Sequence, residues 1–100
     1  MTDWILIRQY IETGSEEAFG QLVERHIALV YSTCLRDLGI PELAEEATQC
    51  VFVQLARNAR TFRPNVRLAS WLFDTSRSTC RNELGVLTTT VAPRDRKMAV

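Results

Sequence analysis

The sequence is poor in the residues from which most catalytic and metal sites are built. It contains one histidine, His26, and three widely separated cysteines, Cys34, Cys50 and Cys80. No C-x-x-C pair occurs, so neither a metal site nor a bound cofactor is expected. We expect the three cysteines to be small buried apolar residues in a reducing cytoplasm. The four glycines stand apart, which excludes a glycine-rich phosphate-binding loop.

The ionisable residues give equally little support to catalysis. His26 falls on an apolar helical stripe, where we expect a core residue with one satisfied polar end rather than a catalytic base. Glu45 and Glu46 are adjacent in a predicted helix, so their carboxylates do not face each other as an acid–base pair would. The sequence therefore does not predict an enzyme.

Long apolar runs and secretory signals are also missing. No run approaches the roughly eighteen apolar residues that cross a membrane. Residues 1–4 lack the basic flank and apolar segment of a signal peptide. With 100 residues, 46% of them hydrophobic, the chain is expected to fold as one globular domain with a single core of modest size.

The charges balance overall but not along the chain. Twelve basic and twelve acidic side chains give a net charge of zero, which taken by itself argues against a nucleic-acid partner. Residues 1–50, however, carry nine acids against three arginines (net −6), and residues 51–100 carry nine bases against three acids (net +6). This asymmetry predicts two surfaces with different partners, unless the halves neutralise each other within the fold. Eleven of the bases are arginine, whose rigid fork of donors suits phosphates and base edges.

Apolar residues recur at three- and four-residue spacing in four segments, which predicts four helices. Thr2 or Asp3 is suited to cap the first helix and Ser15 the second, while Gly14 and Gly39 are suited to end them. The predicted helices span about residues 3–13, 16–38, 41–60 and 68–84. Their apolar stripes are Trp4, Ile7, Tyr10 and Ile11; Phe19, Leu22, Val23, His26, Val30, Cys34 and Leu38; Ala44, Ala47, Val51, Phe52, Leu55 and Ala59; and Leu68, Trp71, Leu72, Thr75 and Thr79.

Two segments fall outside these helices. Residues 61–69 contain Pro64 and Asn65 and are expected to form a loop. Gly85 is expected to stop the last helix, and residues 86–100 have no helical period, so we expect them to form a flexible C-terminal tail or linker. The fold class is therefore predicted as all-α, a four-helix bundle over residues 1–85.

Arginine and aromatic side chains alternate in the loop and at the start of the last helix. This pattern suits single-stranded nucleic acid, where bases stack on aromatic faces and arginines follow the backbone. Trp71 is expected in the core because of its spacing, whereas Phe73 is a candidate for exposure and Phe62 either is exposed or plugs the end of the bundle. The candidate nucleic-acid-binding residues are Arg57, Arg60, Phe62, Arg63, Asn65, Arg67, Arg77, Ser78 and Arg81.

Four pieces of the sequence resemble, in order and spacing, region 2 of bacterial sigma factors of the sigma-70 class. The resemblance is strongest to the extracytoplasmic-function (ECF) group and covers about residues 3–84. The matching pieces are Gly14-Ser15-Glu16-Glu17-Ala18-Phe19, Leu22-Val23-Glu24-Arg25-His26, the run from Ala44 through Glu45-Glu46 to Phe52, and Trp71-Leu72 with Arg77.

The resemblance implies a transcription initiation factor domain in the bacterial cytoplasm. It implies that Glu45, Glu46 and Gln49 bind the β′ clamp helices of core RNA polymerase. It further implies that residues 60–67 capture a flipped base of the promoter −10 element. Of the last helix, it implies that Arg77, Ser78 and Arg81 contact upstream promoter DNA and the non-template strand. An anti-sigma factor is a further partner implied by the family.

The sequence departs from the family pattern at several positions. Cys50 stands where an acid is usual, Ser78 and Asn82 replace an asparagine and an acid, and Gly85 stands where a basic extension usually begins. No second helix-turn-helix domain, with which the family reads the −35 element, is expected in residues 86–100. An alternative interpretation is a helical protein-interaction module that binds polymerase or an anti-sigma factor without recognising DNA.

Overall fold

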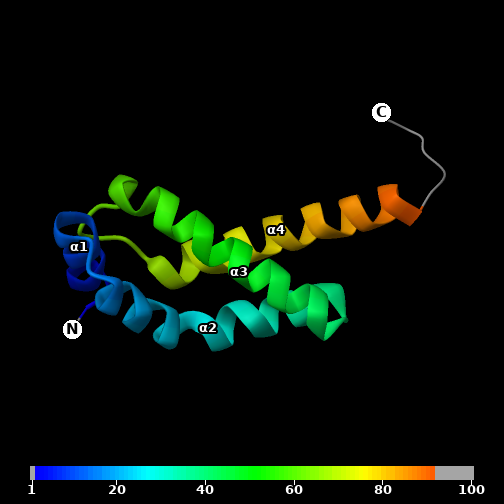
Figure 1. Cartoon of the computed structure of the whole chain (residues 1–100), viewed down its shortest axis with the longest axis horizontal. Coiled ribbons are helices and arrows are strands. Elements are labelled where there is room, and N and C mark those ends of the chain that lie inside the picture. Colours follow the sequence, from blue (N-terminus) through cyan, green and yellow to red (C-terminus); the bar gives the residue numbers. More distant parts are fainter. Residues whose placement is uncertain (1, 92–100) are drawn as a thin grey trace.

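Four α-helices in a bundle make up most of the computed structural model, which describes residues 2–91 (Figure 1). The all-α fold predicted from the sequence is confirmed, and no strand occurs in this part of the chain. In chain order the elements are α1 (Asp3–Thr13), α2 (Glu16–Leu38), α3 (Pro41–Asn58), the short 3-10 helix η1 (Ala59–Thr61) and α4 (Leu68–Val91). None of these helices is both long and apolar enough to cross a membrane.

The ends of the first two helices follow the capping chemistry expected from the sequence. The Thr2 hydroxyl accepts a hydrogen bond from the Ile5 amide (3.3 Å), and the Ser15 hydroxyl accepts one from the Ala18 amide (3.1 Å). Gly14 (φ 68°) and Gly39 (φ 74°) adopt the left-handed conformation that glycine reaches without steric cost. Local sequence therefore fixes where α1 and α2 begin and end.

The predicted end of the last helix is wrong. α4 continues through Gly85 to Val91, and its C-terminal end extends past the other helices (Figure 1). Gly85 is not among the glycines with positive φ, and a glycine inside a helix costs only about 1 kcal/mol relative to alanine. Residues 86–91 of the expected tail are thus helical, and residues 92–100 lie outside the described part. The domain boundary at residue 85 stays a prediction.

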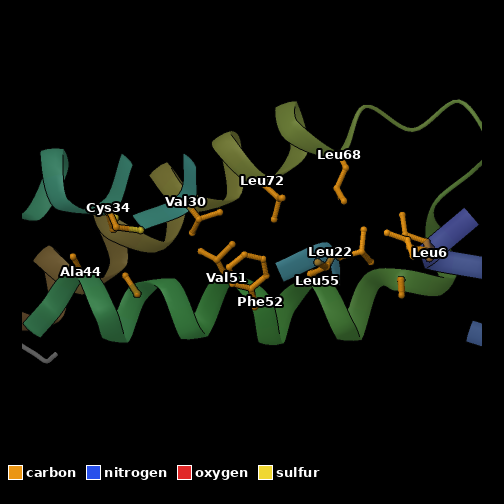
Figure 2. Packing of buried hydrophobic residues seen from close by; sticks show 14 of the residues in the cluster. Leu6, Leu22, Val30, Cys34, Ala44, Val51, Phe52, Leu55, Leu68 and Leu72 are labelled. Atoms are coloured by element: carbon orange, nitrogen blue, oxygen red, sulfur yellow. The ribbon is translucent and has the colours of Figure 1, made fainter. Parts of the chain in front are cut away.

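The core lies where α2, α3 and α4 pack against one another, and α1 packs on α2 to complete it (Figure 2). The whole predicted stripe of α3 is buried, from Ala44 to Ala59. On α1 Ile7 of the predicted stripe is fully buried, as is Leu6, which the prediction missed, whereas the other predicted members are half-buried. The buried Ser76, which the prediction missed, donates its hydroxyl to the Leu72 carbonyl (2.7 Å) and so satisfies its polar group inside the core.

Two predictions about individual polar residues have opposite outcomes. His26 is half-buried, and its Nε2 lies 3.0 Å from a carboxylate oxygen of Asp3, so the expected core histidine with one satisfied end is confirmed. The other Asp3 oxygen lies 3.2 Å from Arg25, which ties the start of α1 to α2.

Cys34 and Cys80 are buried as expected. Cys50, in contrast, is exposed, because it lies one residue before the buried Val51 on α3.

Candidate nucleic-acid interface

The segment between α3 and α4 is a short, hydrogen-bonded loop. Thr61 donates its hydroxyl to the Asn58 carbonyl (2.7 Å), which closes η1 at the end of α3. The Val66 amide then donates to the Arg63 carbonyl (2.9 Å). This bond spans Pro64 at the second position of the turn, where its fixed φ is favourable. The loop therefore covers residues 62–67, slightly less than the predicted 61–69.

Two apolar side chains attach this loop to the bundle. Phe62 and Val66 are half-buried against the core. The ring of Phe62 packs edge-on against Trp71 at the start of α4, with 5.2 Å between ring centroids and an interplanar angle of 81°. Edge-to-face contacts of this kind are favourable for aromatic pairs. Phe62 therefore plugs the end of the bundle, which was one of its two expected roles, and Trp71 packs on the core as expected.

The polar side chains of the loop are exposed to solvent. The exposed residues are Arg60, Arg63, Asn65 and Arg67. They lie between or beside the half-buried side chains of Phe62 and Val66. Among the side chains that the structure describes, those of residues 2–82, no carboxylate forms an ion pair with any of these arginines. η1 and the loop together consequently present three guanidinium groups and one side-chain amide to solvent.

On α4 the predicted residues Arg77, Ser78 and Arg81 are exposed, but Arg77 is already engaged. Its Nε lies 3.6 Å from the carboxylate of Asp37 near the end of α2, and its guanidinium carbon lies 5.9 Å from the ring centroid of the exposed Phe73. Six residues separate Arg77 from Trp71, against which the loop packs, and this corresponds to about 120° around the helix. The structure thus groups the loop arginines together but turns Arg77 toward α2.

The acidic face predicted on α3 is also exposed. Glu45, Glu46 and Gln49 all point to solvent. A shallow depression on this face is lined by Glu46, Gln49, Cys50, Val53, Gln54 and Arg57. Arg57, predicted as a DNA residue, therefore shares a face with the residues predicted to bind polymerase and does not belong to the loop.

An apolar groove between α2 and α3, which the sequence reasoning missed, adjoins this acidic face. Its lining residues are Phe19, Val23, Ile27, Thr48, Gln49, Phe52, Val53 and Ala56. Ile27 is 44% exposed and Val53 50% exposed, so the groove presents two large apolar side chains to solvent. Both residues lie off the predicted core stripes, and this was the signal available in the sequence.

The described residues contain no group of three or more histidine, cysteine or carboxylate side chains able to hold a metal ion. The candidate surfaces therefore differ in charge and hydropathy. The loop and α4 offer arginines, whereas the middle of α3 offers carboxylates beside an apolar groove.

Comparison with known proteins agrees with this geometry. Residues 22–86 match the family described as Sigma-70 region 2. The ECF RNA polymerase sigma factor SigK of Mycolicibacterium vanbaalenii is 40% identical over 68 residues, which are 67% of this chain and 34% of that protein. The ECF RNA polymerase sigma factor SigW of Bacillus subtilis is 29% identical over 63 residues, which are 63% of this chain and 34% of that protein.

A solved structure shares the fold. The NMR structure of an engineered region 2 of sigmaE in complex with GTAAAA superposes with a TM-score of 0.80 at 24% identity, over 91% of this chain and 94% of that one. The chain spans about a third of the length of the curated relatives that it matches. Because the family match covers more than half of the chain, and both curated relatives are ECF sigma factors, the resemblance drawn from the sequence is confirmed: the chain belongs to the Sigma-70 region 2 family.

Proposed function

We propose that this chain is the promoter-recognition domain of a bacterial transcription initiation factor that works in the cytoplasm. Its loop and α4 bind the −10 element, and the acidic face of α3 binds core RNA polymerase. The observation that carries the proposal is that Arg60 of η1 and the loop residues Arg63 and Arg67 are exposed and form no ion pair with the described side chains. Phe62 and Val66 attach the loop between them to the core. The solved complex of the engineered sigmaE region 2 with GTAAAA supports it.

The loop can act on DNA by binding an opened strand rather than by bond chemistry. The three arginines contact phosphates of the non-template strand, and Asn65 at the tip of the turn offers both a donor and an acceptor to a base edge. Taking one base out of the stack costs a few kcal/mol. Phosphate contacts together with capture of the base offset this cost, so that binding favours the separated strands.

The acidic face of α3 is suited to a basic helical partner. Glu45, Glu46 and Gln49 would contact the β′ clamp helices of core polymerase, and the groove beside Gln49 adds exposed apolar area from Ile27 and Val53. Charged residues at such an interface steer association, whereas apolar area supplies affinity. An anti-sigma factor that covers the same face would exclude polymerase.

The DNA half of the proposal is tested by charge reversal in the loop. The variant R63E/R67E should bind a fluorescent single-stranded −10 oligonucleotide at least tenfold more weakly in anisotropy titrations. If both arginines contact phosphates, the slope of log K against log salt should also fall by about 1.4. The control R8E/R36E changes the net charge equally at exposed positions of α1 and α2 and should retain the wild-type slope.

The polymerase half is tested separately by a pull-down with a β′ clamp-helix fragment. The variant E45K/E46K should lose the fragment but keep oligonucleotide binding, whereas R63E/R67E should keep the fragment. A domain that binds the fragment but no single-stranded DNA would instead be the interaction module considered as the alternative. Failure of the wild type in both assays would overturn the proposed function.

A further inference from the structure

A second hollow lies beside the loop, where the turn between α1 and α2 meets the end of α3. We propose that this hollow binds one nucleobase of the same single strand, next to the base held by the loop, and that it prefers guanine. The inference rests on the proposed function, because it requires a single strand at the loop. It adds a base-reading site formed by α1, the start of α2 and the end of α3 with η1, in which Arg60 is the one residue already predicted to bind DNA.

Small residues create the hollow. Ala56, Ala59 and Gly14 line it and leave space that longer side chains would fill. Gly14 takes a left-handed conformation (φ 68°) at the turn, and a Cβ placed there would meet no atom within 4 Å. The hollow is therefore open at the α1–α2 turn.

Part of the wall is apolar, although most of the lining of the hollow is polar. Tyr10 and Ile11 line the hollow, and both are half-buried. The ring of Tyr10 packs against Phe19 of α2 at 4.9 Å between centroids, which restricts its orientation. Aromatic and aliphatic walls of this kind contact the face of a base, because every base presents a π-face.

Two side chains of opposite charge complete the lining. Glu16 at the start of α2 carries a carboxylate that only accepts hydrogen bonds, and Arg60 of η1 carries a guanidinium that only donates them. Guanine presents N–H donors at N1 and N2 and an acceptor at O6, so its edge complements this pair. Adenine and cytosine present one amine donor on this edge and thymine one ring N–H, so only guanine offers two adjacent donors to the two carboxylate oxygens of Glu16.

The other two hollows do not fit a base of a charged strand. The groove between α2 and α3 is lined mainly by apolar residues and has no arginine. The depression on the outer face of α3 has Arg57 but no aromatic wall. Arg60 belongs both to the hollow and to the exposed arginines of the loop segment, which makes the two surfaces continuous.

The test uses guanine and hypoxanthine, which differ in the N2 amine, at each position of a single-stranded −10 oligonucleotide. Wild-type affinity should fall about tenfold when guanine is replaced at one position, within the range of a good base contact. Glu16→Gln should bind the guanine oligonucleotide about as weakly as the wild type binds the hypoxanthine oligonucleotide. In this variant, replacing guanine by hypoxanthine should lower the affinity little further. Circular dichroism melting checks that the variant remains folded.

Glu17→Gln is the matched control, because Glu17 is the exposed neighbour of Glu16 in the same helical turn but does not line the hollow. Removal of either acid should strengthen non-specific binding of an anionic strand through long-range electrostatics. A loss of affinity in Glu16→Gln, opposite to this trend, therefore identifies a direct contact with the base.

The outcomes separate this inference from the proposed function. If the wild type binds no single-stranded DNA even at low salt, the proposed function is wrong. If the wild type binds, but Glu16→Gln and Glu17→Gln have the same base preference at every position, the base site is wrong and the proposed function stands.

Discussion

Arg77 and Asp37 join α4 to the end of α2, with 3.6 Å between the guanidinium Nε and the carboxylate. The pair is partly exposed, so it contributes at most about 1 kcal/mol to stability. The pair has a greater effect on the availability of Arg77. In the proposed function the Arg77 guanidinium contacts a DNA phosphate, and here it is paired with the Asp37 carboxylate instead. Under the proposed function, Asp37 would therefore compete with the DNA backbone for Arg77.

Replacing Asp37 should therefore strengthen DNA binding. We expect Asp37→Asn to raise the affinity for a single-stranded oligonucleotide about three- to fivefold in anisotropy titrations, because it frees Arg77 and removes a like charge near the strand. Asp74→Asn is the control, since Asp74 is exposed on α4 and forms no ion pair with the described side chains of residues 2–82. The excess effect of Asp37→Asn over this control should vanish in an Arg77→Gln background. An equal excess in that background would contradict the competition.

Truncation of the loop anchor should affect both stability and binding. Phe62→Ala removes the edge-to-face contact with Trp71 and should lower the free energy of unfolding by about 2 kcal/mol in urea titrations. Oligonucleotide affinity should fall as well, although the substituted ring is not proposed to contact DNA. Phe62→Leu keeps most of the apolar packing and should show a smaller loss of both. An unchanged affinity in Phe62→Ala would contradict the anchoring role.

The exposed thiol on α3 reports directly on the proposed polymerase interface. Cys34 and Cys80 have no exposed surface, so a maleimide reagent should modify Cys50 selectively in the native protein. A β′ clamp-helix fragment should slow this reaction severalfold, and single-stranded DNA should not. Mass spectrometry of the labelled protein gives the site and the rate, and Cys50→Ser gives the background. Equal labelling with and without the fragment would place the interface elsewhere.

Two valines on α3 form a matched pair for packing and binding. Val51 is fully buried and Val53 is 50% exposed, although both lie in the same helix. Val51→Ala should destabilise the domain by about 2 kcal/mol through the cavity it leaves. Val53→Ala should change stability by less than about 0.5 kcal/mol but weaken the pull-down with the clamp-helix fragment. The reverse pattern would show that the groove belongs to the core.

The continuity of α4 can be tested at Gly85. With a right-handed helical conformation at this residue, Gly85→Ala should stabilise the domain by about 0.5–1 kcal/mol and raise the helical circular dichroism signal. A helix stop at Gly85 would require positive φ, and alanine would then destabilise the protein. The sign of the change in melting temperature therefore distinguishes the two conformations.

The sequence predicted those parts of the fold that depend on local chemistry. Thr2 and Ser15 cap their helices because their hydroxyls reach amides three residues ahead, and this can be read from the order of residues. Gly85 was misjudged because the same residue can end a helix or be tolerated within one, and the difference of about 1 kcal/mol is smaller than the effect of neighbouring contacts.

The candidate site was less accessible from sequence because its decisive contacts are long-range. The ion pair between Arg77 and Asp37 joins residues that are forty positions apart, and no local sequence pattern predicts it. The inward orientation of Phe62 depends on its contact with Trp71. The loop separates these two residues in sequence, so the contact does not follow from the spacing within one helix. The binding roles assigned to individual residues stay predictions until the variants above are measured.

The double attachment of the loop by Phe62 and Val66 also has an entropic consequence. Fixing the backbone of a free residue costs about 1–2 kcal/mol, and the loop comprises six residues, from 62 to 67. In a loop that is ordered before a DNA strand binds, much of this conformational entropy is already lost during folding. Under the proposed function, affinity would then depend mainly on how well a strand fits an existing surface, and sequence discrimination would come from that fit and not from a rearrangement of the protein.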